Sequence, residues 1–296
     1  MGTNNHLSID APDDHPSQST GMREGKGRKR KGDGARTPKM RVKLFGGLNV
    51  IVAGEVIPDE AWKKNKSKLF FAHVVTNYGK AVNRERIIEC LWPDLDHSRA
   101  VDNVYVTWCQ VRRTLERAGS SSDYVSASNC MYRINTDLVE SDVYEFDVLT
   151  RKMLFNNLND KSLAQHIARM EQIYAGDLLS GTTCDPYLAR MRRRYRDTYI
   201  DVLTFASQRA LVHGDNAGAL WFARKALNME NRREDVYQTL MRAQAAAGQR
   251  IPAMETFFMC KSYLDEELGV PLSRRTIELY ERLLNDEEQE GGALGI

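Results

Sequence analysis

A run of hydrogen-bonding side chains between Arg99 and Arg113 has the chemistry needed to read base pairs in DNA. Amide and guanidinium groups can form paired hydrogen bonds with base edges in the major groove. At helical spacing, one face of this segment carries Arg99, Asp102, Asn103, Val106, Cys109, Gln110 and Arg113, with Thr107 and Arg112 at its border. Any surface helix shows polar side chains, so periodicity alone favours a solvated face, and the surrounding elements must decide.

The segments around this face have the element order of a winged helix–turn–helix. Alternating apolar residues from Arg41 predict two or three short antiparallel strands. Helices are expected over residues 65–78, 84–91 and 98–117, with Asn83 and Ser98 as N-caps of the last two. The third helix is expected to bury Val104, Trp108, Val111 and Leu115.

A hairpin completes this first region. Its strands are expected over 124–127 and 131–134, with a turn at Ser128-Asn129. In a winged helix–turn–helix, the second helix of the pair enters the major groove and the hairpin can touch a neighbouring groove or the backbone. The element order therefore favours a base-reading surface over a solvated helix face.

From Asp142 onwards the sequence is nearly all helical, and it contains a repeat. A spacing of 34 residues separates Gly214 from Gly248, and at the same offset Ala219 matches Ala253. Small residues at matching places are typical of stacked tetratricopeptide-like helix pairs. The expected fold is mainly α with a small β portion: a winged helix–turn–helix over 40–136, followed by an all-α tetratricopeptide-like helical repeat domain over 141–285.

The two ends of the chain differ in charge. Residues 1–39 are polar and are expected to be disordered. Residues 23–43 hold ten bases and two acids, a net charge of +8. Such an arm can bind phosphates by releasing counterions, and a solubilising tail is an equally good interpretation. Residues 286–296 are expected to form an acidic flexible tail.

The sequence offers no constellation of residues typical of catalysis, metal binding or cofactor binding. None of its six histidines and five cysteines is paired at metal-ligand spacing. His73 is expected in a core, and Cys90 is expected to be a small buried apolar group. No apolar run could cross a bilayer, and no signal peptide is evident. We therefore expect a cytoplasmic protein that is not an enzyme and needs no cofactor or membrane.

Longer motifs carry a resemblance to known families. The first region resembles the DNA-binding domain of OmpR/PhoB-type regulators through the runs Asn83–Pro93, Val111–Leu115 and Tyr132–Ile134. The second resembles the bacterial transcriptional activator domain through Asp142–Phe146, Tyr174–Leu179 and Glu266–Pro271. Together the two regions look like the actinobacterial antibiotic regulatory protein (SARP) family.

The resemblance implies a sequence-specific transcription activator that binds direct repeats near promoters, self-associates on DNA and contacts RNA polymerase. It implies base contacts from Asp102, Thr107, Cys109, Gln110 and Arg112, and wing contacts from Ser126, Ser128 and Asn129. Phosphate contacts are expected from Lys63, Lys64, Lys66, Arg84 and Arg99.

The predicted base-reading positions depart from the family pattern in their charge. Several positions that are usually basic in such regulators are neutral here, and Asp102 is acidic. Fewer cationic contacts favour weaker and less salt-dependent DNA binding, for which the basic arm could compensate. The alternative is a helical-repeat adaptor that holds protein partners and binds DNA weakly or non-specifically.

Overall fold

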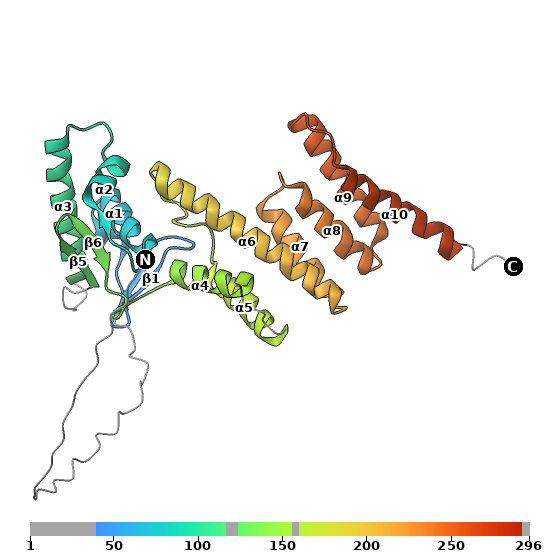
Figure 1. Cartoon of the computed structure of the whole chain (residues 1–296), viewed down its shortest axis with the longest axis horizontal. Helices are drawn as coiled ribbons and strands as arrows, with labels where there is room; N and C mark the ends of the chain where they lie inside the picture. Colours follow the sequence, from blue (N-terminus) through green and yellow to red (C-terminus); the bar gives the residue numbers. More distant parts are fainter. Residues whose placement is uncertain (1–39, 117–123, 156–159, 292–296) are drawn as a thin grey trace, which may run out of the picture. The chain divides into compact units, whose positions relative to one another are not determined.

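The computed structural model describes residues 40–116, 124–155 and 160–291 (Figure 1). Within these ranges the fold is mainly helical with a small β portion, as expected, and every strand precedes the long run of helices α4–α10. The basic arm before Met40 lies outside the described residues. None of the described helices is long and apolar enough to cross a lipid bilayer.

The first sheet has four strands in the order β3-β2-β1-β7. β1 (Met40–Lys43) pairs antiparallel with β2 (Asn49–Val52), and β2 pairs antiparallel with β3 (Glu55–Val56). The fourth strand, β7 (Val139–Ser141), runs parallel to β1. The alternating pattern predicted the first strands but not β7, because a strand this short shows too little alternation to be recognised.

Three helices follow, as predicted: α1 (Asn65–Thr76), α2 (Arg84–Leu91) and α3 (His97–Glu116), with a 3-10 turn, η1 (Asp59–Trp62), before them. The Asn83 side chain accepts a hydrogen bond from the Glu85 amide, which confirms it as the N-cap of α2. The prediction of Ser98 as the next cap is wrong. The Asp96 carboxylate accepts from the Arg99 amide at 3.1 Å, so α3 begins before Ser98.

The second sheet contains the hairpin and has the strand order β4-β6-β5. Its strands are β4 (Val82–Asn83), β5 (Val125–Ser128) and β6 (Met131–Ile134). The turn is displaced from its predicted position at Ser128-Asn129 to Asn129-Cys130, whose φ angles are +50° and +60°. Positive φ at both central residues gives the twist that suits a two-residue hairpin, and Asn tolerates it well.

The C-terminal half consists of α4 (Asp142–Phe155), α5 (Asp160–Ile173), α6 (Pro186–Val212), α7 (Asn216–Met229), α8 (Glu234–Ala246), α9 (Arg250–Ser262), the π-helical η3 (Tyr263–Glu267) and α10 (Arg274–Gly291). α10 continues to Gly291, so the expected acidic flexible tail begins as helix. Glutamate is a good helix former, and the acidic run contains no proline.

The predicted repeat is present in the helix pairs. Gly214 follows α6 with φ +74°, and Gly248 follows α8 with φ +70°, so equivalent glycines lie after the first helix of each pair. Ala219 in α7 and Ala253 in α9 are both 0% exposed. These small side chains lie at equivalent helix contacts, which confirms the tetratricopeptide-like arrangement.

One hydrophobic core extends across both predicted regions. It runs from Met40 in β1 to Val236 in α8. Phe45 of the first region lies 5.2 Å from Phe146, 4.9 Å from Tyr174 and 5.3 Å from Tyr195, measured between ring centroids. The segment between residues 136 and 141, where the domain boundary was predicted, lies within this continuous packing.

Candidate nucleic-acid interface

Aromatic packing fixes the position of α3. The ring of Phe70 in α1 lies 6.1 Å from Trp108 of α3 and 4.9 Å from Tyr132 of β6. The Trp108 and Tyr132 rings are 5.5 Å apart, which closes a three-way contact between α1, α3 and the hairpin. The hairpin and α3 are therefore held next to each other by the same cluster.

Two buried polar contacts also hold α3. The Ser67 hydroxyl donates to the Gln110 side-chain oxygen at 3.0 Å, and the Thr114 hydroxyl donates to the Ala61 carbonyl at 3.0 Å. Gln110 is only half-buried, but its oxygen is engaged by a fully buried serine. The predicted base-reading role of Gln110 therefore competes with a role in positioning the helix.

The outward face of α3 carries most of the predicted base-reading residues. Asp102, Asn103, Val106, Arg112 and Arg113 are exposed, and Cys109 is half-buried. Thr107 is 6% exposed and lies beside Val104 and Val111, so its burial argues against the expected base contact. Each residue turns a helix by about 100°, which places position 107 at the border of the apolar stripe, where neighbouring elements cover it.

Tyr105 is an exposed aromatic on the same face that the sequence analysis missed. Its side chain is 68% exposed, although large aromatics are usually buried. At about 100° per residue, position 105 lies roughly 100° from Val104, at the border of the outward face, so periodicity alone leaves its exposure open.

Several predicted phosphate-binding cations have partners within the protein. The Lys66 ammonium donates to the Leu91 carbonyl and lies 5.4 Å from the Trp92 ring centroid. Arg84 pairs with Glu85 at 3.0 Å. Arg99 pairs with Asp96 at 3.3 Å, and Arg112 pairs with Glu116 at 2.7 Å. Exposed ion pairs contribute little free energy, so a phosphate can compete for these guanidinium groups.

Other cations on this surface are free of ion pairs. Within the described residues, Lys63, Lys64 and Arg113 are exposed, and no ion pair involves them. In the wing, Ser126, Ser128 and Asn129 are exposed as a nucleic-acid contact requires. Exposed Arg133 on β6 adds a cation to the wing that the sequence analysis did not single out.

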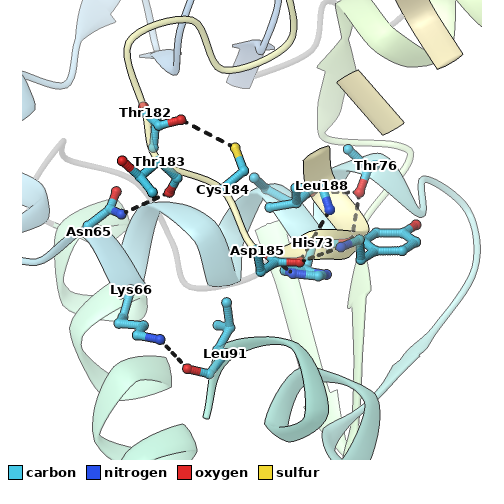
Figure 2. A network of polar contacts seen from close by, with 12 residues as sticks. Asn65, Lys66, His73, Thr76, Leu91, Thr182, Thr183, Cys184, Asp185 and Leu188 are labelled. Carbon is cyan, nitrogen blue, oxygen red and sulfur yellow. Dashed lines mark hydrogen bonds and ion pairs between the residues drawn. The ribbon is translucent and has the colours of Figure 1, made fainter. Parts of the chain in front are cut away.

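The start of α6 lies against α1 (Figure 2). The Asp185 carboxylate accepts from the Tyr187 and Leu188 amides at 3.0 and 3.2 Å and caps α6. Its other oxygen lies 2.9 Å from Nε2 of fully buried His73, whose ring stacks on Tyr187. Burial raises the pKa of Asp185, but the hydrogen bond and charge of His73 outweigh burial and lower it on balance.

Cys90 of α2 completes this buried cluster. A ligand atom from each of His73, Cys90 and Asp185 lies within 4.8 Å of the other two. Burial raises the pKa of the Cys90 thiol to about 11. The sequence predicts His73 and Cys90 as separate core residues, because nothing in their spacing indicates that they meet.

Comparison with known proteins finds a match to a family model within the C-terminal half. Residues 148–284 match the family model described as the bacterial transcriptional activator domain. A search of curated proteins found no match.

Among solved structures, the chain is similar to "Mycobacterium tuberculosis EmbR in complex with low affinity phosphopeptide". The TM-score is 0.70 at 17% identity, over 84% of this chain and 65% of that chain. The matched part thus spans less than two thirds of EmbR, and at this identity the likeness shows a shared fold.

Proposed function

We propose that this chain, whose residues 148–284 match the bacterial transcriptional activator domain, is a transcription regulator that binds double-stranded DNA with α3 in the major groove. The observation that carries the proposal is the exposed face of α3, held beside an exposed hairpin tip by the Phe70–Trp108–Tyr132 cluster. The resemblance to the SARP family supports short direct repeats near promoters as targets and the cytoplasm as the compartment.

We assign separate roles to the exposed residues of α3. The Arg113 guanidinium suits the paired acceptors of guanine, and Asp102 can accept from the amino group of cytosine. Val106, 49% exposed, suits the methyl group of thymine. Tyr105 adds a large contact surface at the edge of the same face. Gln110 contributes only if its bond to Ser67 is released or shared.

Phosphate contacts have a modest cationic basis. Lys63 and Lys64 precede α1, and Arg84 and Arg99 are available at the expense of exposed ion pairs. Each phosphate contact adds to the salt dependence of binding, so a short list of cations favours a shallow salt slope. The basic segment 23–39 would then supply the remaining non-specific affinity.

The helical repeats offer the surface for activation. Trp221, Ile251 and Phe258 are 61%, 71% and 53% exposed on α7 and α9. Exposed apolar side chains on a repeat surface are typical of protein-binding sites. We propose RNA polymerase and a second copy of this chain on adjacent DNA repeats as partners. The same surface also supports the alternative, a protein-binding adaptor with weak DNA binding.

A genome-fragment binding selection with the purified full chain separates the two functions. Regulation predicts recovery of fragments that share a repeated motif. The adaptor predicts no enrichment over random DNA at low salt, and this result would overturn sequence-specific binding.

Point variants then test the docking of α3 on the recovered motif. Arg113→Ala should weaken binding to the motif by about 1–3 kcal/mol and relax the preference at one base pair per half-site. Lys64→Ala should weaken binding to all sequences alike. Lys261→Ala removes a charge at an exposed position of α9 and should leave DNA binding unchanged. Equal effects of Arg113→Ala and Lys261→Ala would show that α3 does not read bases.

A further inference from the structure

The buried cluster of His73, Cys90 and Asp185 is not used by the proposed DNA-binding surface. Its members come from three places: α1, α2 and the residue that caps α6. His73 is fully buried, Asp185 is 9% exposed, and Cys90 is half-buried. An imidazole, a thiol and a carboxylate thus meet inside the protein at a junction between distant segments.

The spacing of these groups fits a small transition-metal ion. Zinc binds sulfur, nitrogen and oxygen ligands at about 2.0–2.3 Å, so ligand atoms in a tetrahedral site lie about 3.3–3.8 Å apart. The three ligand atoms here lie within 4.8 Å of one another. Side-chain rotations that shift the ligand atoms by up to about one ångström would bring them to these distances. Mixed imidazole, thiolate and carboxylate ligation suits zinc.

A hydrogen-bonded His–Asp pair explains only part of the arrangement. His73 uses Nε2 toward Asp185, but its Nδ1 is buried without a hydrogen-bond partner among the described residues. In a metal site the ligand would be Nε2, the nitrogen that faces Asp185, so the ion would lie on the opposite side of the ring from Nδ1 and would not account for it. The pair leaves the convergence of Cys90 on the same point unexplained.

The surroundings support metal ligation. The second carboxylate oxygen of Asp185 is fixed by the Tyr187 and Leu188 amides, and the His73 ring is stacked on Tyr187 at 5.0 Å. Such contacts orient ligands around a metal. Ionised Asp185 and a Cys90 thiolate would together neutralise a divalent cation, with the thiol proton released to solvent on binding.

We propose that His73, Cys90 and Asp185 form a zinc site, with a water molecule as the fourth ligand. A bound ion would tie the two helices that precede α3 to the residue that caps α6. Metal binding would therefore stabilise the junction between the DNA-binding elements and the activator domain.

Cobalt(II) is the probe that tests the site, because its thiolate complexes absorb in the near ultraviolet and its tetrahedral complexes absorb in the visible. The metal-free full chain should bind one equivalent of cobalt with both bands, and zinc should abolish them. Cys90→Ser should remove the thiolate band. Cys184→Ser is the matched control: Cys184 adjoins Asp185 in sequence but accepts from Arg192, so the band should persist.

Two further measurements keep the test independent of folding defects and of DNA binding. In the wild-type chain, zinc should slow alkylation of Cys90 but not of Cys184, as read by mass spectrometry. At free zinc of 100 times its Kd, the ratio of folded to unfolded wild-type protein should rise about 100-fold, and His73→Gln should lose this gain. Absence of a thiolate band, its survival in Cys90→Ser, or equal alkylation rates would overturn the proposal.

Discussion

At the scale of single residues, Asp142 shows how one side chain joins the two regions of the chain. Its carboxylate accepts from the amides of Leu44 and Phe45 at 2.8 and 2.9 Å and from Val143 at 2.7 Å. Burial raises the pKa of Asp142 to about 6, although the three amides act in the opposite direction. The motif Asp142–Phe146 supported the family resemblance, but only the structure shows what Asp142 binds.

The raised pKa of Asp142 predicts an unusual pH dependence of stability. The folded protein holds this proton more tightly than the unfolded chain, whose Asp pKa is near the usual value. The stabilising contribution is therefore full below about pH 4 and is lost as the pH rises through about 6. The free energy of unfolding of wild type, relative to Asp142→Asn, should fall by up to roughly 3 kcal/mol between pH 4 and pH 7.

Urea unfolding of both proteins across this pH range measures the effect. Asp137→Asn, the same change at an exposed residue, serves as the control for net charge. If the free energy of unfolding of wild type instead rose relative to that of Asp142→Asn towards pH 7, the pKa of Asp142 would be lowered by folding, which contradicts the prediction.

At the scale of elements, small residues decide how the repeat helices pack. The Ser207 hydroxyl of α6 donates to the Ala219 carbonyl of α7 at 2.9 Å, which requires a close approach of the two helices. In the second pair, the Thr256 hydroxyl of α9 donates to the Gln244 side chain of α8 at 2.8 Å. The 34-residue spacing predicted Ala219 and Ala253 as equivalent positions, whereas the hydroxyl groups of Ser207 and Thr256 lie at positions that this spacing does not relate.

Replacement of Ala219 by leucine should therefore destabilise the repeat. Ala219 is 0% exposed, and a larger side chain there would overpack the contact between α6 and α7 at a cost of about 1–3 kcal/mol. Ala217→Leu is the matched control, because Ala217 is exposed on the same helix and should change stability by less than about 0.5 kcal/mol. Thermal unfolding reports both, and equal shifts would contradict close packing at Ala219.

At the scale of the whole molecule, the winged helix–turn–helix and the helical repeat region share a core. Strand β7, Asp142 and Phe146 follow the winged helix–turn–helix in sequence but complete its first sheet and cover Phe45. Tyr174 and Tyr199 extend the same aromatic packing, with ring centroids 4.1 Å apart. The helix–turn–helix is thus continuous in packing with the domain that follows it.

A fragment ending at residue 136 should therefore fail to fold cooperatively. It lacks β7 and exposes apolar surface that α4 and α6 cover in the full chain. A fragment over 40–248 keeps every buried residue of the shared core and should unfold cooperatively. Circular dichroism and amide NMR dispersion distinguish the two. A well-dispersed spectrum from fragment 40–136 would show that the first region is independent.

By itself, the sequence determined the fold class, the order of most elements and the likeness to the bacterial transcriptional activator domain over residues 148–284, because periodicity, N-caps and longer motifs are local features. It also predicted that α3 presents Asp102, Asn103, Val106 and Arg113, although the DNA contacts themselves stay a prediction. Only the tertiary structure decided that Thr107 is buried and Tyr105 exposed, because both positions border the apolar stripe of α3 and the packing of neighbouring elements decides which of them is covered. Likewise, the meeting of His73, Cys90 and Asp185 depends on contacts between segments far apart in the chain, which local patterns cannot encode.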